Sequence, residues 1–140
     1  MQLASVHTAS AFEQFLQAAS AEAEPQRMLF VFAAAELPDD ATPEQRAGFS
    51  AGCGGTLTPL MCVDKSPADL AGFAELAAEA SEAGPPWDVV FAAGLSGRSG
   101  RPPSAEQVRA ALDAMVEQVR IGRIGNLLAL DRSGEGLQFF

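Results

Sequence analysis

Residues 28–35, Met-Leu-Phe-Val-Phe-Ala-Ala-Ala, are apolar at every position. An amphipathic helix or a half-buried strand carries polar residues at regular intervals, whereas a strand that is covered on both faces does not need them. The run therefore predicts the central strand of a sheet with helices packed on both faces. The turn-forming residues 37–40, Leu-Pro-Asp-Asp, mark the end of this strand.

Helix-capping signals recur between the apolar runs. A Ser or Thr followed three residues later by Glu or Gln, or by Pro at the first helical position, is typical of a helix start. The predicted starts are Ser10 with Glu13, Thr42-Pro43 with Gln45, Ser66-Pro67 with Asp69, and Ser104 with Gln107. Proline or glycine follows the first, third and fourth of these segments and predicts where each helix ends.

The remaining apolar runs predict further strands, at residues 56–64, 87–94, 124–130 and 137–140. Pro59 lies inside the first of these, so that strand either starts after Pro59 or lies at a sheet edge. Alternation of helices and strands predicts one α/β domain over 1–140, with a mixed, largely parallel sheet of roughly four to five strands and a C-terminal β-hairpin. We expect the segments ending near residues 64 and 95 to run side by side in the same direction.

Composition excludes several function classes. The 140 residues carry a formal charge of −9, which disfavours binding to nucleic acid or to an anionic membrane surface. With one histidine, His7, and two cysteines, the chain lacks the residues of a Ser–His–Asp triad or a histidine-based metal site. Neither a leader peptide nor a membrane span is recognisable, so we expect a cytoplasmic protein without metal or cofactor.

A Gly/Arg stretch at residues 94–101, Gly-Leu-Ser-Gly-Arg-Ser-Gly-Arg, separates a predicted strand from a capped helix. Ligands of open α/β sheets favour such positions, and free N–H groups at a helix start attract anions. We therefore expect Gly97, Arg98, Ser99 and Arg101 to bind a small anionic ligand. The alternative is a solvated loop whose arginines meet nearby acidic side chains.

Asp64 and Lys65 lie at the end of another predicted strand. If they lie at the same sheet edge as Arg98, the three side chains could form one site. Carboxylates with a lysine can perform acid–base chemistry, although turns and caps also favour Asp. Cys62 lies in an apolar run and is predicted to be a small buried hydrophobe. Cys53 lies between glycines and is predicted to be more exposed.

Three functional hypotheses follow from these residues. The first is a non-catalytic binding or interaction protein that recognises a small anion at the Gly/Arg stretch. The second is a homo-oligomeric structural or adaptor protein that associates through a strand edge, since the chain ends in Phe139 and Phe140. The third is an enzyme that uses Asp64, Lys65 and Arg98.

Several longer segments carry a family resemblance. They are residues 27–38, residues 60–65, residues 83–88 and residues 95–98. Together they resemble a family of small proteobacterial proteins often labelled "ribonucleotide reductase subunit alpha", and the resemblance covers most of the chain. It implies a bacterial source and no catalytic residue, because a reductase needs a radical-bearing cysteine and a reducing pair, whereas this chain has only Cys53 and Cys62.

Overall fold

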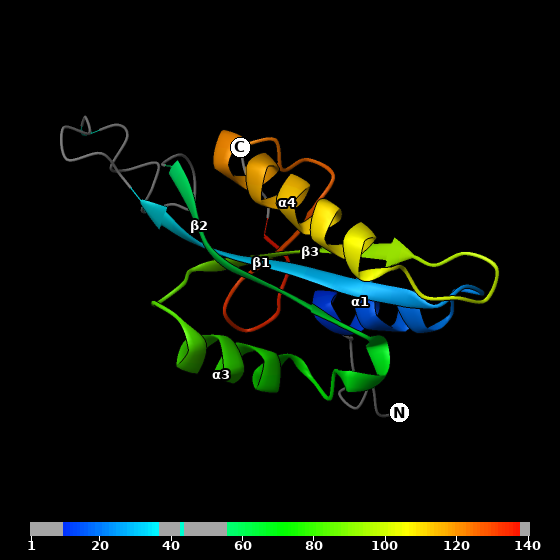
Figure 1. Cartoon of the computed structure of the whole chain (residues 1–140). Helices are drawn as coiled ribbons and strands as arrows, with labels where there is room; N and C mark the ends of the chain where they lie inside the picture. The colour runs from blue at the N-terminus through cyan, green and yellow to red at the C-terminus, as the bar shows by residue number, and fades with distance from the viewer. Residues whose placement is uncertain (1–9, 37–42, 44–55, 138–140) are drawn as a thin grey trace, which may run out of the picture.

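The computed structural model describes residues 10–36, 43 and 56–137. Its elements, in chain order, are α1 (Ala11–Ser20), β1 (Gln26–Glu36), β2 (Thr56–Lys65), a 3-10 turn (Pro67–Asp69), α3 (Phe73–Ala83), β3 (Val89–Ser96), α4 (Ala105–Ile121) and β4 (Leu128–Leu130) (Figure 1). The helix predicted to start at Thr42 lies, except for Pro43, outside the described residues, as do the turn at 37–40 and Cys53.

The sheet has the strand order β2-β1-β3-β4, and every neighbouring pair is antiparallel. The predicted largely parallel sheet is therefore wrong. The prediction assumed that each helix joins two neighbouring parallel strands. Instead, α3 connects β2 to β3 across β1, so these two strands run in the same direction with β1 between them. Their ends near residues 64 and 95 are therefore about 10 Å apart, two strand spacings, rather than adjacent.

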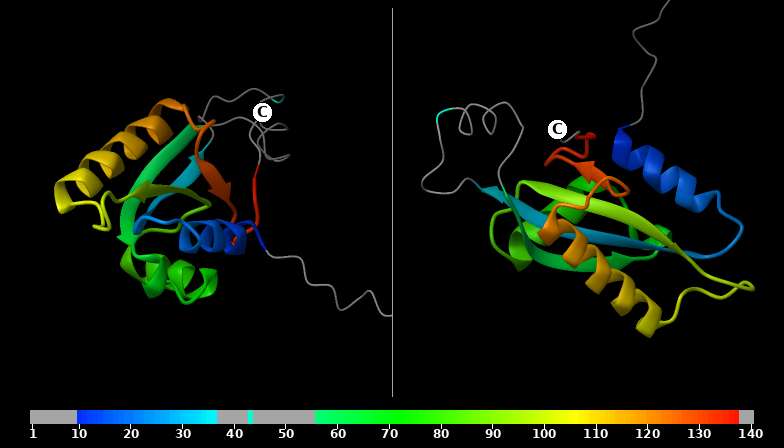
Figure 2. Two further views of the ribbon diagram at one scale, coloured as in Figure 1. Left: turned by 90° about the vertical axis from the view of Figure 1, so that its right-hand side faces the viewer. Right: turned by 90° about the horizontal axis from the view of Figure 1, so that it is seen from above.

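The prediction of a central strand at 28–35 is confirmed by β1, in which six consecutive residues are buried. Alternate residues of β1 point to opposite faces, and each face has its own apolar cluster. Met28, Phe30 and Phe32 pack with α1 and α3, whereas Leu29 and Val31 pack with α4. Figure 2 shows the resulting three layers, with α4 on one face of the sheet and α1 with α3 on the other.

Two of the predicted capping boxes form as expected. The Ser10 hydroxyl accepts from the Glu13 N–H at 3.1 Å, and the Ser104 hydroxyl accepts from the Gln107 N–H at 3.1 Å. Gly122 then ends α4 in the left-handed conformation that glycine adopts without strain.

The predicted helix start at Ser66 is wrong. The Ser66 hydroxyl donates to the Asp69 carboxylate at 2.8 Å and caps no backbone amide. Only a 3-10 turn forms there, and α3 begins at Phe73 after Gly72. The turn does not continue as an α-helix, because the backbone of Leu70, directly after it, is extended (φ −98°, ψ 102°).

The start of β3 is anchored by Trp87, which is 1% exposed. Its ring packs edge-on against Phe32, with ring centres 4.9 Å apart. At the other end of the chain, Leu137 N–H donates to the Ala129 carbonyl at 2.8 Å, so the chain turns back on β4 as expected. Residues 138–140, with Phe139 and Phe140, lie outside the described part. Within that part, every helix is too short or too polar to cross a bilayer.

Candidate functional site

The Gly/Arg stretch forms a tight hairpin just beyond β3. Arg98 and Arg101 exchange two backbone hydrogen bonds, of 2.9 and 3.0 Å, around Ser99 and Gly100. Both central residues have positive φ, 55° and 77°, as a type I′ turn requires. Gly97 is sterically obligatory, because a Cβ atom there would lie 1.9 Å from the Arg101 carbonyl oxygen. We call residues 97–101 the Gly/Arg hairpin.

The exposed amides of this hairpin bind a carboxylate of the chain itself. Glu24, in the segment between α1 and β1, accepts from Gly100 N–H at 2.7 Å and from Ser99 N–H at 2.9 Å. Two adjacent amides converging on one carboxylate form an anion-binding nest. The sequence pattern thus indicates an anion-binding loop, and the structure places an internal anion there.

The other predicted site residues do not converge with the hairpin. Asp64 and Lys65 are consecutive on β2, so their side chains point to opposite faces of the sheet. Asp64 pairs with Arg27 of β1 at 2.6 Å, and Lys65 pairs with Glu79 of α3 at 2.8 Å. Arg98 lies beyond the end of β3 and lines neither of the two grooves described below. The structure therefore does not bring together the three side chains that the enzyme hypothesis requires.

A different feature stands out at β2, which is an edge strand of the sheet. Pro59 lies within it, so of the two predicted alternatives, a strand that starts after Pro59 or a strand at a sheet edge, the second is correct. Across the ladder, Pro59 faces Ala33 of β1, whose carbonyl accepts from Asp88 N–H at 2.9 Å on the β3 side. In an antiparallel strand, the N–H and C=O groups of one residue point to the same neighbouring strand, and those of the next residue point to the opposite side. The backbone groups of Ala33 therefore point to β3, and those of Pro59 point away from β1. The missing N–H of Pro59 thus falls on the outer edge and costs no bond to β1.

The same alternation tells which other groups face outward. Cys62 and Asp64 lie opposite Val31 and Leu29. Leu29, Val31 and Ala33 are every second residue of β1, so their backbone groups all point to β3. The N–H and C=O groups of Cys62 and Asp64 therefore point to the outer edge, where no described strand pairs with them. This end of β2 offers a row of backbone donors and acceptors, which is the structural basis for adding a further strand.

A groove of about 550 Å³ flanks this edge on the face that α4 covers, and we call it the α4 groove. It is lined by Arg27, Cys62, Asp64, Pro102, Pro103, Ala105, Val108, Arg109, Leu112 and Asp113. Its floor is open because β2 presents small or polar side chains there, Cys62 and Asp64, where β1 presents Leu29 and Val31. Both signs of charge line it, two arginines and two aspartates.

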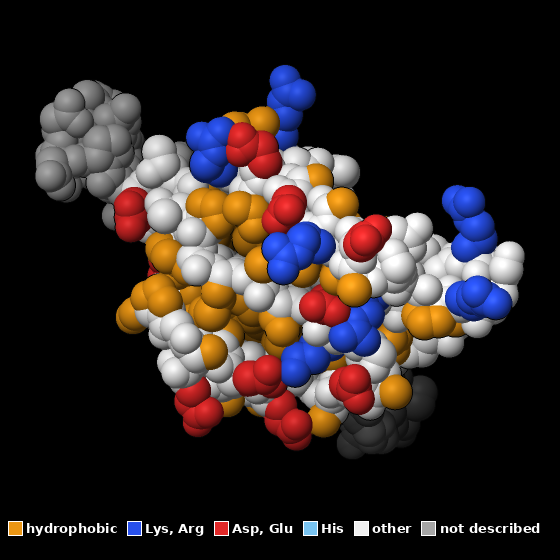
Figure 3. Space-filling model, in the orientation of Figure 1, with side chains coloured by type: hydrophobic (Ala, Val, Ile, Leu, Met, Phe, Trp, Pro, Cys, Tyr) orange, Lys and Arg blue, Asp and Glu red, His pale blue; other side chains and the backbone are white. Residues whose placement is uncertain are grey.

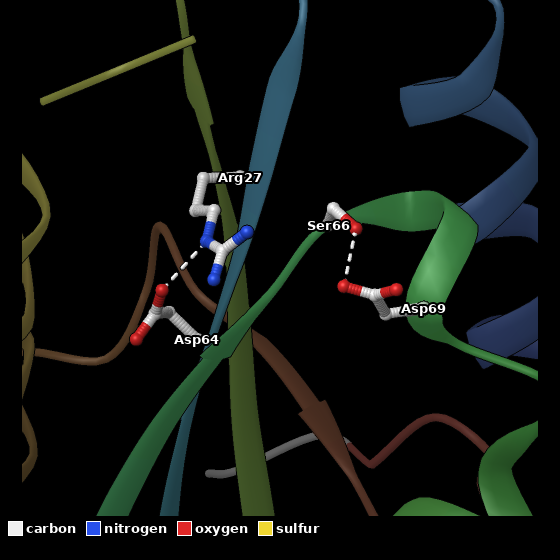
Figure 4. A network of polar contacts seen from close by, with 4 residues as sticks. All are labelled: Arg27, Asp64, Ser66 and Asp69. Atoms are coloured by element: carbon white, nitrogen blue, oxygen red, sulfur yellow. Dashed lines mark hydrogen bonds and ion pairs between the residues drawn. The ribbon is translucent and has the colours of Figure 1, made fainter.

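One ion pair orders the end of the α4 groove. Arg27 Nε donates to Asp64 at 2.6 Å, and the two side chains are 33% and 31% exposed (Figure 4). Figure 4 also shows the second polar contact, Ser66 with Asp69, farther along the chain and turned away from this pair. The remaining charges of the groove, Arg109 and Asp113, project from the exposed side of α4.

A second groove, of about 210 Å³, flanks β2 on the opposite face, and we call it the α3 groove. It is lined by Phe32, Met61, Cys62, Val63, Leu76, Glu79, Ala80 and Ala83. All of these except Glu79 are apolar or weakly polar, so this groove suits apolar side chains. In Figure 3 hydrophobic side chains gather in the hollow between α4 and α3, with charged side chains beside it.

Cys62 lines both grooves and is exposed, so the prediction that it is buried is wrong. Because β2 has a neighbouring strand on one side only, the Cys62 side chain stays accessible to solvent. Partial burial raises the pKa of the thiol, and the carboxylates of Asp113 and Asp64 raise it further, against a smaller opposing effect of Arg109. The thiol therefore stays protonated at neutral pH, which disfavours nucleophilic chemistry.

A third cavity, of about 470 Å³, lies at the other edge of the sheet, where β4 begins at Leu128. β4 pairs only with Val90, Phe91 and Ala92, so the later residues of β3 pair with β1 on one side and with no described strand on the other. This cavity is lined by no charged side chain, and it exposes a shorter stretch of backbone than β2 does.

Sequence reasoning gave a sheet edge as one of two alternatives for the strand that holds Pro59, and it missed the two grooves beside that strand. The signal was present, because Cys62 and Asp64 replace large apolar side chains on one face of an otherwise apolar strand. Within the described residues, no group of three metal-ligating side chains is found. Comparison with family models, with curated proteins and with solved structures gives no match, so the proposals below rest on this chain's own geometry.

Proposed function

We propose that this protein is a non-catalytic interaction protein that binds an extended segment of a partner polypeptide along the outer edge of β2. One observation carries the proposal: the outward backbone groups of β2 lie between two grooves, one on each face of the sheet. Strand addition of this kind takes its affinity from main-chain hydrogen bonds and its specificity from pockets for alternate side chains.

The geometry of strand pairing matches the two grooves. In an added antiparallel strand, the residues opposite Cys62 and Asp64 exchange backbone hydrogen bonds with them. Their side chains lie on the α4 face, while the intervening residues, opposite Met61 and Val63, point into the α3 groove. One extended segment would therefore fill both grooves with alternate side chains.

Charge favours a different polypeptide over a second copy of this chain. Two copies of this chain each carry a formal charge of −9 and therefore repel each other. A second β2 aligned antiparallel over Cys62–Asp64 would also place another Asp64 beside the groove that already holds Asp64 and Asp113. Like charges placed together in an interface disfavour that pairing.

Amide hydrogen exchange on the whole chain tests the proposal. In the free protein we expect the Cys62 and Asp64 amides to exchange fast and the Met61 and Val63 amides slowly, because only the latter face β1. A peptide that alternates valine with threonine should slow exchange at Cys62 and Asp64. The proposal fails if the peptide leaves both amides unprotected, or if their protection rises with protein concentration alone, which would indicate a second copy at the edge.

A pair of variants at one position separates backbone from side-chain effects. Cys62→Pro removes an outward N–H and should weaken binding of the valine–threonine peptide at least about ten-fold. Cys62→Ser keeps the N–H and should change the affinity by less than about two-fold. Equal binding by both variants contradicts docking at this edge. If Cys62→Pro does not fold, the exchange pattern of the unsubstituted protein decides alone.

A further inference from the structure

We infer that the third cavity, beside the unpaired end of β3, is a second binding site, for a small uncharged ligand with a flat amide-like edge. Such an edge carries a hydrogen-bond donor next to an acceptor, as a primary amide or a lactam does. The cavity measures about 470 Å³, and small-molecule sites measure about 300 to 1,000 Å³. It lies on the side of the sheet away from β2, so this inference is independent of the proposed docking at β2.

Gly94 turns both of its backbone groups toward the unpaired side of β3, where it lines the third cavity. In the ladder with β1, Gly94 lies opposite Met28. The backbone groups of Leu29 point to β3, so those of Met28 point to β2, and those of Gly94 point away from β1. On that side β4 begins only at Leu128, opposite Ala92. The N–H and C=O groups of Gly94 therefore pair with no described strand and offer a donor beside an acceptor.

The chain just before β4 turns away from the sheet and leaves this position open. If the ladder between β3 and β4 continued by two residues, Gly94 would pair with Asn126. Instead, Leu127 N–H donates to the Ile124 carbonyl at 3.0 Å, which closes a turn. The space beside Gly94 is also open, since only Gln26 Oε1 lies within 4 Å of an added Cβ atom. A glycine inside a strand is typical of a place where a ligand approaches the backbone closely.

The apolar walls of the third cavity come from both faces of the sheet. Phe15 of α1 belongs to the cluster on one face, and Met115 of α4 belongs to the cluster on the other. Hydrogen bonds at a strand edge lie in the plane of the sheet. A group bonded to Gly94 therefore lies between the layer of α1 and the layer of α4 (Figure 2). A flat ring suits this position, because apolar side chains would contact both of its faces.

Two amide side chains add to the polar groups of the cavity. Gln118 of α4 and Asn126 both line it, and neither side chain has a hydrogen-bond partner within the described residues. No charged side chain lines it among these residues. A charged ligand would lose hydration here without gaining an opposite charge. An uncharged edge with a donor and an acceptor pairs with Gly94 and leaves the side-chain amides for further polar groups of the ligand.

Benzamide is the probe for this site, because it is flat and uncharged and carries C=O and N–H side by side. Benzoate and benzamidinium have nearly the same shape with a negative or a positive charge, and N,N-dimethylbenzamide has no donor. In NMR titrations of the whole chain, we expect benzamide to shift the Gly94 amide signal with a dissociation constant on the order of 1 mM. The three analogues should bind at least about five-fold more weakly.

Substitutions test whether the ligand lies at this edge. Gly94→Val fills the space beside the backbone and should abolish binding of benzamide. The φ angle of Gly94 is outside the left-handed region and valine suits strands, so we expect this variant to fold. Gln118→Met removes an amide at nearly constant size and should weaken binding about three-fold or more. Gln17→Met, the same change at an exposed position of α1 outside the cavity, should leave binding unchanged.

The inference is wrong if about 10 mM benzamide leaves the Gly94 signal unshifted, or if benzoate or benzamidinium binds as tightly as benzamide. Unchanged binding by Gly94→Val also contradicts it, and if that variant does not fold, Gln118→Met against Gln17→Met decides. Shifts confined to Cys62 and Asp64 would place benzamide in the grooves beside β2 and overturn the inference. None of these results bears on strand docking at β2, which the amide exchange experiment tests separately.

Discussion

The Gly/Arg hairpin and the edge of β2 both present backbone N–H groups at the surface, but they differ in what satisfies them. In the hairpin, Arg98 and Arg101 bond each other and Glu24 binds the two amides at the tip. Along β2, the outward groups of Cys62 and Asp64 meet no described strand. The amides of the Gly/Arg hairpin are therefore bonded within the chain, whereas the outward backbone groups of β2 pair with no described strand. Local composition is a poor guide to which surface is free to bind.

The largest expected effect concerns closure of the hairpin. Gly97→Ala places a Cβ atom 1.9 Å from the Arg101 carbonyl oxygen and 2.9 Å from that of Pro25, so the backbone must shift. We expect a loss of about 3 kcal/mol in the free energy of unfolding, measured by chemical denaturation. Gly125→Ala is the matched control, because nothing lies within 4 Å of its added Cβ. Equal stability of the two variants would show that the hairpin is not closed as described.

A smaller effect is expected from the internal anion. Glu24→Ala removes the acceptor for Ser99 N–H and Gly100 N–H and should cost about 1 kcal/mol, since the site is partly exposed. It also frees the nest, so inorganic phosphate should raise the unfolding temperature of the variant more than that of the unsubstituted protein. Glu24→Gln keeps one acceptor and should fall between them. If phosphate raised the unfolding temperature of all three proteins equally, phosphate would bind at a site other than the hairpin amides.

The smallest effect concerns a second loop that satisfies itself, the turn at residues 131–135. Burial raises the pKa of Asp131, but bonds from the Ser133 hydroxyl and from backbone amides outweigh it and hold the pKa below its ordinary value of 3.8. A lowered pKa stabilises the fold above the unfolded value, and that contribution is lost as the pH falls through the folded value. Asp131→Ala should therefore cost less than about 1 kcal/mol near neutral pH.

Stability measured against pH checks this turn. The difference in unfolding free energy between the unsubstituted protein and Asp131→Ala should shrink as the pH falls below about 3.8. Asp131→Asn, which keeps an oxygen acceptor without the charge, should lie between the two at neutral pH. A difference that stays constant down to acid pH would mean that the carboxylate charge contributes nothing to this turn.

Much of the fold was predictable because it depends on neighbours in sequence. The capping boxes at Ser10 and Ser104, the end of α4 at Gly122 and the doubly covered strand at 28–35 all appear as expected. Pro59 indicated either a strand start or a sheet edge, because a residue without an N–H fits where no ladder bond is lost. The helix start at Ser66 gave only a 3-10 turn, because the backbone is already extended at Leu70.

The site was harder to predict, because it depends on which strand lies between which others. The sequence does not state that β1 separates β2 from β3, and that arrangement alone makes the sheet antiparallel and leaves β2 at its edge. It also decides that Glu24, far along the chain from the hairpin, reaches Ser99 and Gly100. Asp64 and Lys65 are neighbours in sequence, yet the pleat of the strand sends them to different grooves.

By itself, then, the sequence determined the local conformations, since helix caps, turns and the period of apolar residues are set by hydrogen bonds and sterics within a few positions. Only the tertiary structure decided strand order, and with it which backbone groups are paired, which acidic side chain reaches the hairpin, and which edge stays open. The physical reason is that pairing between distant segments depends on the packing of the whole sheet between its helix layers, which short stretches of sequence do not specify.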